Sequence, residues 1–158
     1  MLVNFDALED SARLFLYPSN KKFYPELFEE INSSLNQFIT EWCFKHHIEA
    51  GYTIKHLRFI LIAINPNSPV STLVIDELVS FIFKLQSHHQ IELLDKLNVC
   101  FKQGEHVQYK EVKDFKKMIK NRSVNENTVV FDHLINTKGE LESNWELPAK
   151  ESWYSRMF

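Results

Sequence analysis

The stretch Leu57–Ile64, which reads LRFILIAI, decides the fold, because it is nearly continuous in apolar residues. A strand with one face in water alternates apolar and polar side chains, whereas a strand covered on both faces is apolar throughout. We therefore expect a central strand here, with other parts of the chain packed on both faces of its sheet.

The segments around this strand alternate between strand and helix patterns. Ala12–Tyr17 is a short apolar run that ends at Pro18, which predicts a strand followed by a turn. A long helix is predicted from Pro25, because apolar residues then recur at three- and four-residue steps: Leu27, Ile31, Leu35, Phe38 and Trp42. A second helix is predicted roughly from Ser71 to Ser87, after a loop of turn-forming residues.

The C-terminal part predicts shorter elements. Val99–Lys102 and His106–Lys110 have the pattern of a hairpin around Gly104. A short helix over about Glu111–Lys120 and a last strand at Thr128–Phe131 follow. The order of elements is therefore β-α-β-α-β-β-α-β.

This order predicts an α+β protein in which helices pack on a mixed β-sheet. The crossovers between the first strands are long enough for these strands to be parallel. An α/β three-layer sandwich is the alternative. We expect residues 1–95 to form a β-α-β-α core and residues 96–158 to form a β-β-α-β module with an aromatic tail, packed together as one compact unit.

The composition is that of a globular protein, with 44% apolar and 25% charged residues. A net charge of −3 without a dense basic stripe argues against a nucleic-acid partner. The N-terminus lacks a signal-peptide pattern, and the longest apolar run, Phe59–Ile64, is far shorter than the ~20 residues that span a bilayer. Cys43 and Cys100 are too few and too far apart for a disulfide framework. We therefore expect a cytoplasmic protein with buried thiols and no membrane partner.

Four stretches carry a family resemblance that covers nearly the whole chain. They are Ser11–Asn20 (SARLFLYPSN), Arg58–Ala63 (RFILIA), the pair Ile75-Asp76, and the tail from Leu94 to Phe158 with its Trp-Glu, Pro and Ser-Trp-x-x-Arg-Met motifs. In these stretches the chain resembles a group of small bacterial proteins commonly labelled "ABC transporter ATPase". Other members carry a Cys-Ser or similar pair before the position of Ile75, where this chain has Leu73 and Val74.

The residues argue against the activity that this label implies. A phosphate-binding P-loop needs closely spaced glycines followed by Lys-Ser or Lys-Thr, because only glycine lets successive backbone N–H groups close on the phosphates. The three glycines of the chain, Gly51, Gly104 and Gly139, lie far apart, and none precedes such a pair. We therefore reject ATPase activity and expect no cofactor.

A second resemblance covers Phe101–Ala149 alone. This part is similar to the bacterial GYF-related modules, which combine a hairpin, a helix and a strand with a tryptophan near a Pro-Ala pair. The matching residues are Gly104, Phe115, Ile119, Val124, Thr128, Val129, Trp145, Pro148 and Ala149. The glycine-proline after the hairpin is missing, and Asp132–Asn144 is longer than in those modules. The resemblance implies a module that grips extended or proline-containing peptides through aromatic faces.

Two histidine pairs and one carboxylate are candidates for metal binding or catalysis. His46-His47 and His88-His89 each fall near the end of a predicted helix, and both pairs would meet at one pole if the helices ran in the same direction. Asp76 lies early in the second helix. The simpler interpretation is that histidines and carboxylates stabilise the helix ends whose charge they complement. A small metal-binding protein or enzyme that uses Asp76 and these histidines is the alternative function.

The C-terminal aromatic residues are the main candidates for a binding surface. Trp145, Trp153 and Tyr154 lie in a polar context with Arg156 nearby, and Phe131 ends the last predicted strand. Such residues more often cap a core, but exposed tryptophan, tyrosine and arginine are also the residues most enriched in interface hot spots. The sequence thus favours a non-catalytic adaptor that binds a protein or peptide through this region, and leaves a homo-oligomeric state open.

Overall fold

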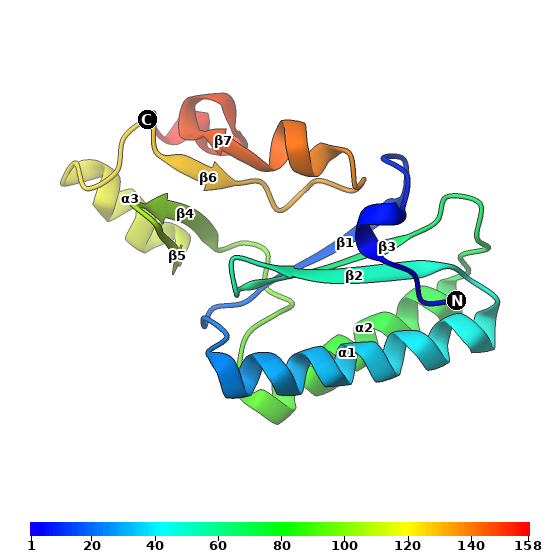
Figure 1. Ribbon diagram of the computed structural model, residues 1–158. Helices are drawn as coiled ribbons and strands as arrows, with labels where there is room; N and C mark the ends of the chain where they lie inside the picture. Colours follow the sequence, from blue (N-terminus) through cyan, green and yellow to red (C-terminus); the bar gives the residue numbers. More distant parts are fainter.

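The computed structural model describes residues 1–158 and contains two antiparallel sheets with helices packed on them (Figure 1). The first sheet has the order β1-β3-β2 and is formed by β1 (Arg13–Pro18), β2 (Ala50–Lys55) and β3 (Phe59–Ile64). The second has the order β5-β4-β6-β7 and is formed by β4 (Val99–Gln103), β5 (His106–Lys110), β6 (Val129–Phe131) and β7 (Glu146–Pro148). The predicted α+β class is therefore confirmed.

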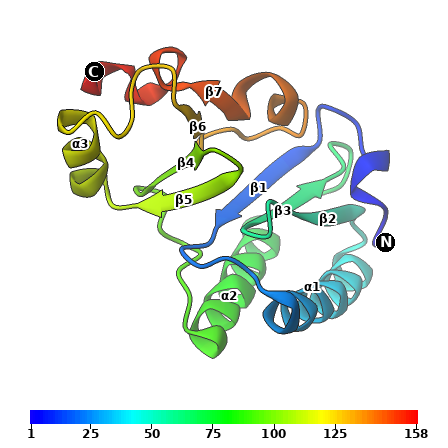
Figure 2. The ribbon, with the colours of Figure 1, turned by 60° about the vertical axis from the view of Figure 1, so that its left-hand side comes forward.

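The helices α1 (Pro25–His46) and α2 (Thr72–His89) cover the face of the first sheet that lies away from the second sheet (Figures 1 and 2). Their apolar stripes, including Ile31, Leu35, Leu78 and Ile82, join one large buried cluster with strand side chains. The amphipathic spacing explains this packing, since a three- and four-residue repeat brings apolar side chains to one side of a helix.

The second sheet carries the short helix α3 (Val112–Lys120), whose Phe115 is fully buried against it. Four single turns complete the chain: η1 (Phe5–Ala7), η2 (Leu141–Trp145), η3 (Ala149–Glu151) and η4 (Trp153–Met157). The predicted hairpin, short helix and last strand of this region are all present. None of the helices is both long enough and apolar enough to cross a bilayer.

The strand β3 is the central element that its sequence predicts. All six of its residues are buried, and it lies between β1 and β2. Ile60, Ile62 and Ile64 face the helices, whereas Phe59, Leu61 and Ala63 belong to a second cluster that joins the two sheets. Its continuous apolar run therefore reflects burial on both faces, one against helices and one against another sheet.

The strand directions and the division into sheets correct the expectation of a mixed, partly parallel sheet. β1 and β3 are antiparallel because the chain forms an additional strand, β2, which returns directly to β3 through a tight hairpin. Without parallel β-α-β units the α/β sandwich alternative is wrong as well. The sequence of β2, AGYTIK, alternates apolar and polar residues, but the run is short and begins with Ala50 and Gly51, which are both depleted in strands. Its turn also lacks the Asn-Gly pair that usually signals such a hairpin.

Candidate functional site

A recess of about 280 Å³ lies beside Trp153. Three segments that flank strands of the second sheet or follow it in the chain meet there. Its walls come from residues 96–97 before β4, residues 132–134 after β6, and residues 152–154 at η4, with Val112 of α3 alongside. We call it the Trp153 recess. Sequence-distant segments thus build one hollow next to the C-terminus.

Three large apolar side chains around this recess are exposed to water. Leu97 is 82% exposed, Leu134 is 70% exposed and Trp153 is 50% exposed, and all three line the recess. A single exposed apolar side chain is ordinary, but a group of them around one hollow is typical of a surface that binds another molecule. The recess is therefore a candidate binding surface.

The C-terminal turn holds Trp153 outward while the next residue anchors the turn. The Ser152 hydroxyl donates to the carbonyl of Ala149 at 2.8 Å and accepts from the Tyr154 N–H at 3.0 Å. Tyr154 is buried, and its ring centroid lies 6.0 Å from that of Phe115. The guanidinium of Arg156 lies 5.3 Å from the Trp153 ring centroid, a cation–π distance. Trp153 is thus a fixed, half-exposed aromatic platform and not a loose tail residue.

His133 lines the same recess and is itself buried. Its Nδ1 lies 3.4 Å from the Lys96 carbonyl oxygen, which can only accept a hydrogen bond, so Nδ1 carries the proton. Burial lowers the pKa of His133 to about 4, so the imidazole is neutral near pH 7. Nε2 is then an unprotonated acceptor, and it is buried without a hydrogen-bond partner. The protein itself thus leaves this buried acceptor without a hydrogen bond.

The structure separates the predicted binding residues into two groups. Trp153, Tyr154 and Arg156 lie at or beside the recess. Phe131 and Trp145 are buried between the two sheets, with ring centroids 5.0 Å apart and both packed on Phe59. These two rings form part of the core and are not available to a partner. Leu97, His133 and Leu134 were missed by sequence reasoning, and their isolated positions in polar segments give no periodic signal.

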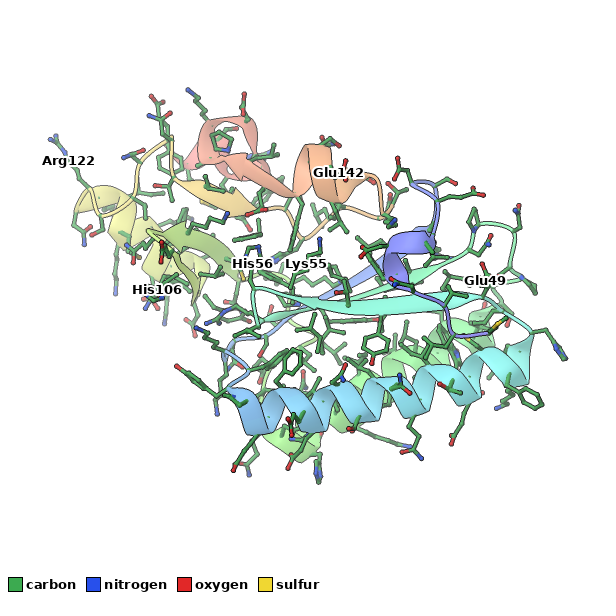
Figure 3. The ribbon with its side chains drawn as sticks, viewed as in Figure 1. Glu49, Lys55, His56, His106, Arg122 and Glu142 are labelled. Atoms are coloured by element: carbon green, nitrogen blue, oxygen red, sulfur yellow. The ribbon has the colours of Figure 1, made fainter.

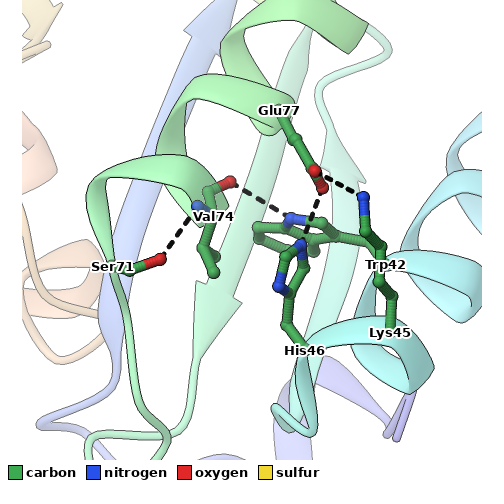
Figure 4. Close-up of polar contacts among 6 residues, drawn as sticks. All are labelled: Trp42, Lys45, His46, Ser71, Val74 and Glu77. Atoms are coloured by element: carbon green, nitrogen blue, oxygen red, sulfur yellow. Dashed lines mark hydrogen bonds and ion pairs between the residues drawn. The ribbon is translucent and has the colours of Figure 1, made fainter.

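The two histidine pairs lie at opposite ends of the helix pair, which corrects the expectation of one metal-binding pole. His46 contacts Glu77 near the start of α2 (Figure 4), whereas His89, at the end of α2, lies 3.6 Å from Glu30 near the start of α1. The helices are therefore antiparallel, and His46-His47 cannot meet His88-His89. No three His, Cys, Asp or Glu side chains are grouped so that they could hold a metal ion.

Asp76 is exposed and contacts neither Lys45 nor His46; the next residue, Glu77, contacts both. Glu77 accepts from Lys45 Nζ at 2.6 Å and lies 2.8 Å from Nε2 of His46 (Figure 4). The pKa of Glu77 is lowered, first by the hydrogen bond from Lys45 and then by that from His46.

Cys43 and Cys100 are both buried free thiols, and desolvation raises the pKa of each, to about 12 for Cys100. Neither thiol is therefore activated as a nucleophile.

No family model, no curated protein and no solved structure matches the chain.

Proposed function

We propose that this protein is a non-catalytic adaptor of the cytoplasm that binds an extended segment of a protein or peptide in the Trp153 recess. The observation that carries the proposal is the grouping of three exposed apolar side chains, Leu97, Leu134 and Trp153, around one hollow. Two buried free thiols support a reducing compartment.

The size of the recess favours one or two side chains over a complete small molecule. Its volume of about 280 Å³ lies just below the range of roughly 300–1,000 Å³ that is typical of small-molecule pockets. A leucine-sized or aromatic side chain of the partner would contact Leu97, Leu134 and Trp153.

The electrostatics of the recess support binding without catalysis. His133 is neutral and buried, and its proton is fixed on the side of the Lys96 carbonyl. A general acid or base works best when its pKa lies near the working pH, and a pKa of about 4 is far from neutrality. The imidazole therefore serves as a neutral part of the recess wall.

Selection from a random peptide display library tests this function. Peptides selected on the wild-type protein should bind Trp153→Ala at least tenfold more weakly, since a central tryptophan of an interface contributes about 2 kcal/mol or more. Phe44→Ala is the matched control, because Phe44 is 84% exposed on α1, away from the recess. Its binding should equal that of the wild type.

Thermal unfolding of both variants completes this experiment. Each should unfold at nearly the wild-type temperature, because neither side chain is part of the core. A wild-type selection in which no peptide is weakened by Trp153→Ala would overturn the proposal, as would a library from which the wild-type protein selects nothing.

A further inference from the structure

The strand β5 forms a sheet edge that no other segment of the chain covers. The outer side of β1 is bonded to residues 136–138, through Leu14 N to Asn136 O and Lys138 N to Ala12 O, both at 2.9 Å. The start of β2 is paired with the N-terminus through Val3 N to Ala50 O at 2.9 Å. The edge strand β7 has only three residues and ends in Pro148. β5 has five residues and pairs with β4 alone (Figure 2).

The register of the β4–β5 hairpin shows which groups of β5 are free. Gln103 pairs with His106 across the two-residue turn at Gly104, so these two residues exchange hydrogen bonds. In an antiparallel ladder such pairs alternate with pairs that are not bonded to each other. The N–H and C=O groups of Val107 and Tyr109 therefore point away from β4, toward the open edge, and no other backbone group of the chain bonds to them.

A second recess, of about 440 Å³, lies between the start of β5 and the β2–β3 turn, and we call it the β5-edge recess. Residues 105–108 form one side, and Lys22, Tyr24, His56, Leu57 and Arg58 form the other. Figure 3 shows His56 at the β2–β3 turn and His106 at the start of β5. An extended segment that lay along β5 would enter this recess.

The recess carries positive charge that the chain does not neutralise. Arg58 is half-buried, and its Nη1 donates to the carbonyl oxygens of Ser19 and Asn20 at 3.0 Å each, but no carboxylate lies within 4.0 Å of its guanidinium. Lys22 also lacks an ion-pair partner, and its Nζ lies 5.8 Å from the Tyr24 ring centroid. Glu105 is the one acidic residue of the lining. A half-buried cation without a counter-ion favours a ligand that brings a carboxylate.

We propose that β5 accepts an acidic, extended segment of a partner protein as an additional strand of the second sheet. The backbone of this segment pairs with the free groups of Val107 and Tyr109, and its Asp or Glu side chains lie against Arg58 and Lys22. Strand addition supplies affinity through backbone hydrogen bonds, whereas side-chain contacts supply specificity. This surface is separate from the Trp153 recess and does not depend on it.

Peptide selection on the Trp153→Ala variant tests this surface with the first recess impaired. Peptides from a random display library that bind this variant should be rich in Asp and Glu and poor in proline. Adding Lys22→Gln should weaken them at least tenfold, whereas adding Lys116→Gln should not, because Lys116 is an exposed lysine of α3 outside the recess. Adding Val107→Pro should abolish binding while keeping the hairpin, since the N–H of residue 107 is not bonded to β4.

Hydrogen exchange of the selected complex locates the peptide. The amides of Val107 and Tyr109 should be slowed by bound peptide, by at least tenfold, and those of Leu97 and Leu134 should be unchanged. Selected peptides without acidic enrichment, or peptides that leave the exchange of Val107 and Tyr109 unaltered, would overturn the β5 proposal. If the β5 proposal fails, the effect of Trp153→Ala on binding at the Trp153 recess still tests the first proposal. If the first proposal fails, the Lys22→Gln and Val107→Pro variants still test the β5 proposal, because each variant impairs one site.

Discussion

Nε2 of His46 lies 2.8 Å from one carboxylate oxygen of Glu77, and the other oxygen of Glu77 accepts from Lys45, so the last turn of α1 is bonded to the first part of α2 (Figure 4). Both partners of Glu77 sit at the negative end of α1, where positive charge is favourable. This cluster joins α1 and α2 at one end of the helix pair, and the His89–Glu30 contact joins them at the other end.

The first prediction concerns the acid stability of this cluster. The pKa of Glu77 in the folded protein is below its usual value of 4.5, so its contribution to stability is present above about pH 4.5 and is lost as the pH falls below that value. Glu77→Gln should lower the melting temperature at pH 7, and the difference from the wild type should shrink toward pH 3. Asp76→Asn is the control, because Asp76 is exposed and unpaired, and it should melt like the wild type at both pH values.

The second prediction concerns the buried imidazole of the Trp153 recess. The pKa of His133 falls from 6.5 to about 4 on folding, so the unfolded chain binds one more proton between these values. The contribution of neutral His133 to the free energy of unfolding is therefore fully present above pH 6.5. It should decrease as the pH falls toward 4, by roughly 3 kcal/mol in all. His133→Leu should remove this part of the pH dependence in urea unfolding. At pH 7 its stability should lie near that of the wild type, because the substitution removes the unpaired acceptor Nε2 but also the Nδ1 donor to the Lys96 carbonyl.

His47→Asn serves as the comparison for this measurement, because His47 is exposed at the C-cap of α1, where asparagine also tolerates the left-handed backbone. Its pH dependence should follow that of the wild type. A wild-type profile that stays flat between pH 6.5 and 4 would contradict the structural account of His133. If His133→Leu is also weaker in binding the peptides selected on the wild type, the imidazole is retained for binding at some cost in stability.

The third prediction concerns the turn between β2 and β3. His56 and Leu57 have φ values of 55° and 53°, and the Arg58 N–H donates to the Lys55 carbonyl at 3.1 Å, as in a type I′ turn. A left-handed conformation costs a residue with a side chain about 1–2 kcal/mol, and glycine avoids this strain but loses more entropy on folding. Leu57→Gly should therefore stabilise the protein by about 0.5–1 kcal/mol and raise the melting temperature by a few degrees.

Leu57→Ala separates strain from other effects of this substitution. Alanine has the same left-handed penalty as leucine, so this variant should show no increase in melting temperature. An equal gain from alanine and glycine would show that the exposed leucine side chain, and not the backbone, limits stability at this turn.

The fold follows from local patterns to a large extent. The apolar run of β3 predicted a strand buried on both faces, and the helical stripes of α1 and α2 predicted their inner faces, because periodicity depends on nearest neighbours along the chain. The strand β2 was missed, since its alternating run is short and begins with Ala50 and Gly51, and the turn after it has no glycine. That one strand reverses the direction of the chain, so β1 and β3, which were expected to be parallel strands of a mixed sheet, are antiparallel.

The candidate sites depended on contacts that no local pattern records. The sequence pointed to the C-terminal aromatics as a group, but only packing separated Trp145 and Phe131, which fill the space between the sheets, from Trp153, which stays half-exposed. Likewise, the antiparallel course of α1 and α2 placed the two histidine pairs at opposite ends.

The sequence by itself determined the α+β class, the core faces of the long helices and the absence of a P-loop, because each depends on residues close together in the chain. Only the tertiary structure decided which aromatic rings reach water, which neutral histidine lines a recess, and which strand edge remains open. These properties arise where Leu97, His133 and Trp153, or Arg58 and Val107, meet in space, and burial of one segment by a distant one cannot be read from either segment alone.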